Sequence, residues 1–237
     1  FIIVGVWLDE NKLVIYNGDL TGRIVPVNAD LWNEDELREV IQKGEDFLNI
    51  RFKESFTSEA IKASSGNVYI VQETCHRACN ESGIHKTVVG ERRLVGDGLN
   101  ARSLVAEIIQ EQSGRYNAFI TNYASGFQET ALAMHKWLLY PILTSSIEEL
   151  SKGLTYRSIR SKITSGHPQG KNLNPGNITQ ALKAVSSLQL SKSIQPIILD
   201  YDESNLTLHI VDKGFLIWLS MQDRNELLST VGLPEMT

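Results

Sequence analysis

A basic stretch in the C-terminal half of the chain has the composition of an anion-binding surface. Residues 151–199 contain seven Lys and Arg residues and no Asp or Glu. Positive side chains without neighbouring carboxylates attract anions, above all the phosphates of nucleic acids. Residues 1–150 hold 14 basic against 21 acidic residues, and residues 200–237 hold two against seven. The net charge of −5 therefore conceals a local excess of positive charge, for which a solvated basic face is the alternative interpretation.

Residues 177–189 predict a helix with one apolar and one polar face. The apolar residues recur at helical spacing and are expected to be buried. They are Ile178, Ala181, Leu182, Val185 and Leu188. The opposite face carries hydrogen-bonding side chains and a cation but no carboxylate, in the order Thr179, Gln180, Lys183, Ser186, Ser187 and Gln189. Because Gln can pair with adenine and Lys can reach guanine or phosphate, this face predicts contact with DNA.

Basic residues and a helix end flank this polar face. The helix is entered through Asn174-Pro175-Gly176-Asn177, which leaves its positive N-terminal end available to a phosphate. Lysines on either side would contact the DNA backbone and so position the protein without reading sequence. The predicted DNA-binding residues are Arg157, Arg160, Lys171, Thr179, Gln180, Lys183, Ser187 and Lys192.

Two other clusters resemble chemical sites but lack the required spacing. In GHPQGKN (residues 166–172) the glycines are one residue too close for a phosphate-binding P-loop, an asparagine replaces the hydroxyl residue, and no strand precedes it. Cys75, His76 and Cys79, with His85 nearby, suggest zinc. Helical periodicity, however, puts the two cysteines on a buried stripe and turns His76 about 100° away. We expect no metal site and no nucleophile, base and acid arrangement in this chain.

The elements that position these residues predict a mostly α-helical fold with a small β content. Asn33 with Glu36 predicts a capping box at the start of an amphipathic helix whose apolar face includes Leu37 and Phe47. A shorter helix around residues 56–61 and a third from Asn67 follow, and together they predict a small helical bundle. The two cysteines do not suggest a disulfide framework, which is typical of a reducing, cytoplasmic compartment. No window approaches the roughly 18 apolar residues of a membrane span, so no membrane partner is expected.

The C-terminal elements follow a specific order. After further helical patterns in residues 101–112, a helix around residues 132–139 is followed by a second around residues 155–163 and by a polar loop. The helix at 177–189 comes next, and the alternating runs QPIILDYD and NLTLHIVD predict a β-hairpin. Helix, helix, loop, helix and hairpin is the order of a winged helix-turn-helix.

The stretch NGDLTGR places Asp19 and Arg23 in a turn between the apolar run FIIVGVW and the predicted helical bundle. This order of strand, D-x-x-x-R turn, three-helix bundle and winged helix resembles the second half of a P-loop ATPase of the AAA+/STAND group, close to the origin-recognition and archaeal-type ATPases. GNVYIVQETC resembles the start of the last lid helix of that group. LHIVDKGFLIWL resembles its closing strand and helix, although Lys213 and Gly214 depart from the Asp-Pro junction of the common Y-x-I-x-D-P-x-F-x-x-W pattern. The Walker A and Walker B motifs are absent, and the lid helix lacks a sensor arginine.

The resemblance implies the following division of the chain. Residues 1–28 are the last strand and turn of a nucleotide-binding core, residues 29–86 a helical lid, residues 87–127 connector helices and residues 128–237 the winged-helix domain. The intact protein is then expected to be longer than this chain, to bind ATP and Mg, to hydrolyse ATP and to self-associate through the ATPase core. The chain alone should be inactive, because it lacks the P-loop.

Within this resemblance Arg23 is a candidate arginine finger that reaches the γ-phosphate of a neighbour, with Asp19 beside it. The alternative role of Arg23 is structural, tying the turn to the lid through Asp19 or a backbone carbonyl. Two other functions stay open from the residues alone. One is a winged-helix regulator that binds DNA without any ATPase, and the other is a protein-interaction module that contacts an effector protein in a multi-subunit defence or mobile-element system.

Overall fold

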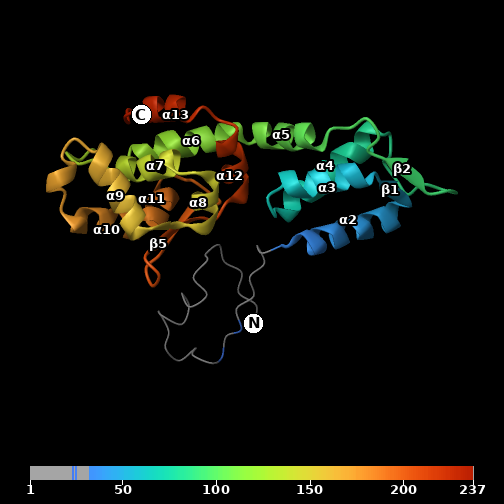
Figure 1. Cartoon of the computed structure of the whole chain (residues 1–237), viewed down its shortest axis with the longest axis horizontal. Helices are drawn as coiled ribbons and strands as arrows, with labels where there is room; N and C mark the ends of the chain where they lie inside the picture. Colours follow the sequence, from blue (N-terminus) through green and yellow to red (C-terminus); the bar gives the residue numbers. More distant parts are fainter. Residues whose placement is uncertain (1–22, 24, 26–31, 237) are drawn as a thin grey trace. The chain divides into compact units, whose positions relative to one another are not determined.

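The chain is mostly helical and divides into two compact units between Ser113 and Gly114 (Figure 1). The computed structural model describes residues 23, 25 and 32–236, and we call residues 32–113 the N-terminal unit and residues 114–236 the C-terminal unit. The predicted opening strand and Asp19 lie outside the described residues. The boundary between the units falls within residues 87–127, the segment predicted to be a connector.

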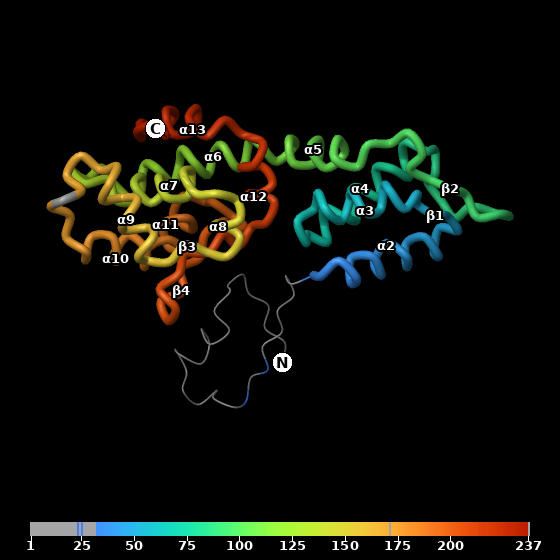
Figure 2. Tube along the Cα trace, in the orientation of Figure 1, coloured from blue at the N-terminus to red at the C-terminus, as the bar shows by residue number. Residues whose placement is uncertain are grey.

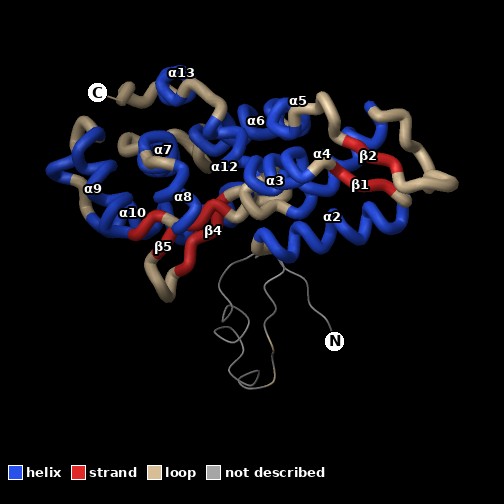
Figure 3. Tube along the Cα trace, turned by 45° about the vertical axis from the view of Figure 1, so that its right-hand side comes forward, coloured by secondary structure: helices blue, strands red, loops and turns tan. Residues whose placement is uncertain are grey.

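Helices and one short two-stranded parallel sheet form the N-terminal unit. Its elements are α2 (Glu34–Leu48), β1 (Ile50–Phe52), α3 (Glu54–Ala63), α4 (Val68–Glu81), β2 (Arg93–Val95) and α5 (Ala101–Glu111). The predicted capping box opens α2, where Asn33 Oδ1 accepts a hydrogen bond from the backbone N–H of Glu36 at 2.9 Å and the Glu36 carboxylate accepts one from the N–H of Asn33 at 2.9 Å. Strands β1 and β2 pair in parallel and lie side by side in Figure 3. The segment before α5, predicted as connector, thus contributes a strand.

The N-terminal unit is held together by an aliphatic core with one aromatic stack. Leu37 and Ile41 of α2 are buried against apolar residues of α3, α4 and α5. Phe47, predicted to share this face, is instead 80% exposed. The inner position that follows Ile41 by one helical turn is taken by Glu45, whose buried carboxylate accepts a hydrogen bond from Phe52 N at 2.6 Å. Glu45 thus links α2 to β1 from the buried side of the helix.

The C-terminal unit combines helices with a three-stranded antiparallel sheet. Its elements are α6 (Ser113–Ala124), α7 (Met134–Thr144), α8 (Ile147–Lys152), β3 (Leu154–Thr155), α9 (Tyr156–Gly166), η2 (Gly170–Asn172), α10 (Pro175–Lys183), α11 (Val185–Ser191), β4 (Leu199–Asp202), β5 (Thr207–Ile210), α12 (Lys213–Ser220) and α13 (Arg224–Thr230). The strand order is β3-β5-β4. In the register, Leu208 of β5 lies opposite both Leu154 of β3 and Tyr201 of β4. The predicted β-hairpin is confirmed as β4 and β5, and its turn projects beyond the helices (Figure 2).

The helix predicted over residues 177–189 is two helices rather than one. α10 ends at Lys183 and α11 starts at Val185, with Ala184 between them at φ −87° and ψ 0°. The predicted buried face is confirmed, since Ile178, Ala181, Leu182, Val185 and Leu188 are all buried. The break gives α11 its own direction, in which it packs on β4.

An aromatic cluster joins α6 to α12 in the core of the C-terminal unit. The ring of Tyr116 lies 5.5 Å from that of Phe215 and 5.4 Å from that of Trp218. Beside the cluster, Arg115 Nη1 donates a hydrogen bond to Asp212 Oδ2 at 2.7 Å. Asp212 also accepts from Phe215 N at 3.3 Å and so caps α12. The first helix and the last part of this unit are therefore linked by both apolar packing and an ion pair.

Candidate nucleic-acid interface

Tyr156, the first residue of α9, joins the three parts of the predicted interface. Its backbone N–H donates to the carbonyl of Leu206, in the β4–β5 turn, at 2.8 Å. Its hydroxyl donates to the carbonyl of Pro175, the first residue of α10, at 3.2 Å. These two bonds hold the start of α9, the start of α10 and the hairpin turn next to one another. Tyr156 thus links the three segments through one backbone and one side-chain hydrogen bond.

Helix α9 presents two arginines from a helix that is anchored on its other face. Ile159 and Ile163 are buried, and α9 packs on α7. Arg157 and Arg160 are exposed, and neither makes a hydrogen bond or an ion pair with a described residue. Because they are three residues apart on one helix, they lie on the same side of it. Their guanidinium groups remain available to an external anion.

Helix α10 offers fewer free donors than its sequence suggested. Its exposed face includes Gln180, whereas Thr179 is half-buried. The Thr179 hydroxyl donates to the carbonyl of Pro175 at 3.2 Å, and the Ser187 hydroxyl donates to that of Ala184 at 3.0 Å. Both hydroxyls retain lone pairs that can accept from a base or a water. Of these three predicted contacts, Gln180 alone keeps its side-chain donors unused among the described residues.

Gln189, predicted to lie on the polar face, is fully buried and has a structural role. Its amide nitrogen donates to the carbonyls of Val185 at 3.1 Å and Leu199 at 2.7 Å. Its amide oxygen accepts from the backbone N–H groups of Ile198 at 2.7 Å and Leu199 at 3.0 Å. The side chain thus satisfies the backbone where the chain enters β4. Ser186 also turns inward, and its hydroxyl donates to Asp200 Oδ1 at 3.1 Å.

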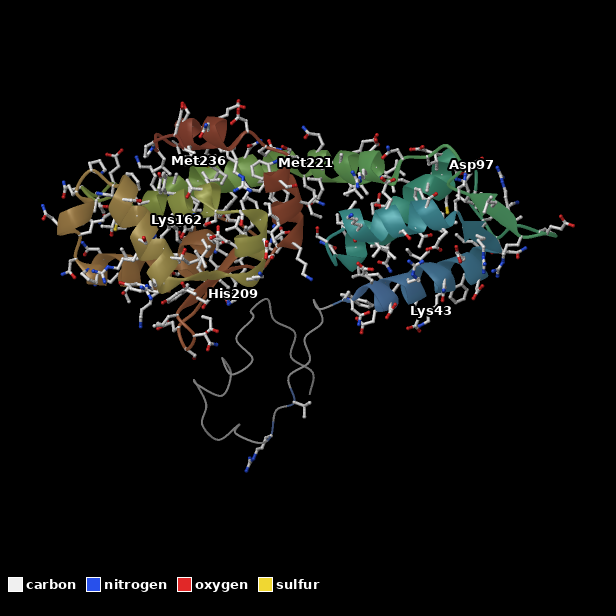
Figure 4. All side chains as sticks on the ribbon, in the orientation of Figure 1. Lys43, Asp97, Lys162, His209, Met221 and Met236 are labelled. Atoms are coloured by element: carbon white, nitrogen blue, oxygen red, sulfur yellow. The ribbon has the colours of Figure 1, made fainter. Side chains whose placement is uncertain are left out.

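Several lysines of the basic stretch have partners that lie outside it in sequence. Lys183 Nζ lies 2.5 Å from Glu203 Oε2 in the β4–β5 turn. Lys152 Nζ lies 2.6 Å from Glu148 Oε1, within α8. Lys162, labelled in Figure 4, donates to the carbonyl of Thr144 at 3.1 Å. Among the described side chains of this stretch, the cations without a partner are Arg157 and Arg160 on α9 and Lys192 at the end of α11.

The remaining predicted residues are not brought into this junction. Lys192 is half-buried at the C-terminal end of α11, and its ammonium makes no bond with a described residue. Lys171 belongs to η2, and its side chain lies outside the described part of the chain. Arg23 is exposed in a turn. Asp19 lies outside the described residues, so its pairing with Arg23 stays a prediction.

The loop GHPQGKN is built around a buried histidine rather than around a phosphate site. His167 Nδ1 accepts from Gln169 N at 3.0 Å, and its Nε2 lies 3.1 Å from the carbonyl of Leu132. Nε2 therefore carries the proton and donates it, which assigns the tautomer from its partners. The imidazole ring also packs on Trp137, with ring centroids 4.6 Å apart. A Cβ at Gly170 would lie 2.0 Å from the carbonyl oxygen of Thr164, so the loop backbone packs too closely for any side chain there.

The cysteines of α4 belong to the core of the N-terminal unit. Cys79 is buried, and Cys75 packs against the same core. Burial, followed by the proximity of Cys79 and of the Glu45 carboxylate, raises the pKa of the Cys75 thiol to about 12. This thiol is therefore protonated at neutral pH. Among the described residues, no three His, Cys, Asp or Glu side chains come together as a metal site.

The β4–β5 turn carries residues that the sequence patterns did not single out. Burial raises the pKa of the Asp202 carboxyl, but hydrogen bonds from Asn205 and Ser204 outweigh that effect, and the net pKa is lowered. Burial, and then the charge of Glu203, raises the pKa of the Tyr201 hydroxyl. The alternation LDYD predicted a strand but gave no sign that its acidic end would meet α10. That contact joins residues far apart in sequence, and only the hairpin register brings them together.

Comparisons with protein-family models, with curated proteins and with solved structures found no match to this chain. No helix formed by the described residues is both long enough and apolar enough to cross a membrane.

Proposed function

We propose that the C-terminal unit is a winged helix-turn-helix domain that binds double-stranded DNA through α9 and α10. The observation that carries the proposal is the pair Arg157 and Arg160, exposed on α9 without a described partner and held by Tyr156 beside the start of α10. Arginine is well suited to phosphate because its planar group offers several donors at once. Phosphate contacts of this kind supply affinity and orientation, whereas Gln180 is the residue best placed to read a base.

The arrangement of elements supports the same proposal. Helices α7 and α8 precede β3, helices α9, α10 and α11 follow it, and the β4–β5 hairpin comes after them. The strand order β3-β5-β4 is the one expected where the first short strand joins the edge of a C-terminal hairpin. In a helix-turn-helix the second helix of the pair enters the major groove, and in the pair α9 and α10 that helix is α10. The projecting β4–β5 turn would be the wing.

We further propose that the chain is the C-terminal part of an ATP-dependent ATPase of the AAA+/STAND type. The helical N-terminal unit, opened by the capping box of Asn33, would be the lid that couples nucleotide state to DNA binding. This part of the proposal rests on the sequence resemblance and on the mostly helical character of that unit. ATP and Mg would be bound by the intact protein, and Arg23 would act at a neighbouring subunit. ATP hydrolysis by this purified chain alone would overturn it.

The test of DNA binding is a salt series with a random-sequence duplex. The full chain is compared with an Arg157→Gln, Arg160→Gln variant between about 50 and 200 mM salt. Each lost phosphate contact lowers the slope of log affinity against log salt by about 0.9, so the variant should lose about two units of slope and at least about tenfold in affinity. Both substitutions are at exposed positions, so the fold should be retained, which circular dichroism checks.

A matched control separates specific loss from a general change in charge. Arg77→Gln with Arg102→Gln removes the same charge from the N-terminal unit, where both arginines are paired with carboxylates. This control should bind DNA as the parent does. If the parent does not bind at low salt, or if both variants lose the same affinity, α9 is not a DNA-binding surface.

A protein-interaction module is the second candidate, and two exposed leucines favour it. Leu190 on α11 is 54% exposed and Leu206 in the β4–β5 turn is 53% exposed. Leu206 also has a φ of 51°, in the left-handed region that leucine rarely adopts. An apolar residue held at a projecting turn suits contact with another protein. This alternative predicts no DNA affinity even at low salt, so the same titration distinguishes the two.

A further inference from the structure

An internal carboxylate holds the cation at the end of α10. Lys183 is the last residue of α10, and its Nζ lies 2.5 Å from Glu203 Oε2. Both side chains are about half-exposed, so water and other anions can reach the pair. Lys183 therefore differs from Arg157 and Arg160, which lie on the same junction without any described partner.

The hairpin turn is rigid enough to place this carboxylate. Asp202 Oδ1 accepts from the backbone N–H groups of Ser204 at 2.8 Å and Asn205 at 2.9 Å, and its Oδ2 accepts from Asn205 Nδ2 at 2.7 Å. The carbonyl of Leu206 is bonded to Tyr156 N at 2.8 Å. Glu203 lies between these anchored residues. Because its backbone is fixed, its carboxylate loses less entropy in the ion pair than one on a flexible loop would.

We propose that the end of α10 is a phosphate-binding position that the Glu203 carboxylate occupies in the free protein. The inference rests on the proposed DNA-binding function. When DNA binds, a backbone phosphate replaces the carboxylate as the partner of Lys183. Carboxylate and phosphate present similar anionic oxygens to an ammonium group, so the exchange keeps the charge of Lys183 paired throughout. Glu203 lowers affinity for DNA in general, because each duplex must displace it.

The test compares substitutions that differ only in which ion pair they break. Glu203→Gln should raise affinity for a random-sequence duplex severalfold, because no carboxylate has to be displaced, and should leave the salt slope near that of the parent, because the contact between Lys183 and phosphate forms in both. Glu148→Gln is the matched control, because it also removes one negative charge from an exposed Lys–Glu pair of the same unit, the pair with Lys152 at 2.6 Å. This control should leave both quantities unchanged.

A double variant assigns the gain to Lys183. Glu203→Gln combined with Lys183→Gln should lose the gain in affinity and lower the salt slope by about 0.9 relative to the parent, because the contact between Lys183 and phosphate is then absent. Isotherms are measured for all variants with one duplex and one salt series.

The outcomes separate this inference from the proposed function. If neither the parent nor any variant binds DNA at low salt, the proposed function and this inference are both wrong. If the parent binds and depends on Arg157 and Arg160, but Glu203→Gln binds no more tightly, the inference alone fails. It also fails if Glu148→Gln raises affinity as much as Glu203→Gln does, because the gain is then a general effect of net charge. A gain confined to Glu203→Gln and removed by Lys183→Gln supports it.

Discussion

The two units differ in how their unpaired cations are arranged. In the N-terminal unit the ion pairs of Lys and Arg have distances of 2.6–3.2 Å and join Arg38 with Glu54, Lys43 with Glu39, Lys53 with Asp97, Arg77 with Glu73 and Glu111, Arg92 with Asp46, and Arg102 with Glu59. Arg51, Lys62 and Lys86 of that unit have no described partner and lie on three separate segments. In the C-terminal unit Arg157 and Arg160 have no described partner either, but they share one side of α9. The comparison therefore indicates that unpaired cations gathered on one helix, rather than the number of basic residues, mark a surface for an external anion.

The cores of the two units differ as well. The N-terminal unit buries mainly aliphatic side chains, with one aromatic stack of Phe52 on Phe56 at 5.4 Å. The C-terminal unit buries a cluster of aromatic rings, in which Phe119 lies 5.3 Å from Phe215 and Trp218 lies 5.4 Å from Phe215. Aromatic side chains each bury a large area, so removal of one is costly. The C-terminal unit should thus be the more sensitive to a single core truncation.

Trp218→Ala is expected to cause the largest loss in the free energy of unfolding. Trp218 is fully buried in the aromatic cluster, and truncation of such a residue costs about 3–5 kcal/mol in the free energy of unfolding. Hydrogen exchange of the full chain, read by peptide, measures this separately for each unit. Protection should fall in peptides of residues 114–236 and be retained in those of residues 32–113.

Phe47→Ala provides the control for a large apolar residue outside the core. Phe47 is 80% exposed, so its truncation should change the free energy of unfolding by no more than about 0.5 kcal/mol. Equal losses of protection in both units after Trp218→Ala would show that the two units unfold together. That result would contradict the greater sensitivity of the C-terminal unit.

Substitution of a buried polar side chain is expected to cause the next largest loss in the free energy of unfolding. Gln189→Leu removes four hydrogen bonds and leaves backbone groups of Ile198 and Leu199 without the side chain that pairs them, at an expected cost of about 3 kcal/mol or more. Glu45→Leu, in the N-terminal unit, removes the bond to Phe52 N and should cost about 1–3 kcal/mol. Urea denaturation of each variant measures both. A smaller loss for Gln189→Leu than for Glu45→Leu would contradict this ranking.

Local patterns in the sequence predicted much of the fold. The capping box of Asn33, the start of α4 after Asn67 and the buried face of α10 and α11 follow from residues that are neighbours along the chain. The hairpin also followed from alternation. Phe47 and Gln189 were assigned to the wrong face, because each depends on a strand edge that offers unpaired backbone groups to a nearby polar side chain. Helical periodicity does not contain that information.

The sequence predicted which basic residues belong to the candidate site but not which of them are paired with carboxylates. The basic stretch correctly contains the exposed Arg157 and Arg160. The partner of Lys183 was missed, because Glu203 lies just beyond the carboxylate-free stretch and on a hairpin that folds back to α10. The anchoring role of Tyr156 was missed for the same reason, since one of its two bonds reaches the β4–β5 turn. Counting charges in a window of sequence cannot detect contacts of this kind.

Breaking an ion pair of the N-terminal unit is expected to cause a smaller loss in the free energy of unfolding. Arg77 makes two hydrogen bonds to Glu111, at 2.7 and 2.9 Å, and a further one to Glu73. Arg77→Gln should lower the free energy of unfolding by about 1 kcal/mol or less, and less still at high salt, because pairs that water can reach are screened. Thermal denaturation at low and high salt measures the loss. A loss well above that range would make this pair an essential part of the N-terminal unit.

The smallest effect is a pH dependence confined to the C-terminal unit. Burial lowers the pKa of His209, an effect that outweighs the nearby carboxylates of Asp202 and Asp200. His209, seen on the hairpin in Figure 4, fits beside Gly153, where a Cβ would lie 2.7 Å from its Nδ1. The folded state therefore binds a proton less readily than the unfolded state does. The stabilisation is complete above the unfolded pKa of about 6.5 and decreases as pH falls below that value.

His209→Gln should flatten this part of the pH dependence. Urea denaturation at about pH 7.5 and pH 5.5 gives the difference in free energy of unfolding for parent and variant, and the difference should be smaller in the variant. His135, whose pKa burial also lowers, contributes in the same direction, so some dependence should persist after His209 alone is replaced. Both histidines belong to the C-terminal unit. A parent chain that is more stable at the lower pH would reverse the sign and contradict the assignment of His209 as a ring kept neutral by burial.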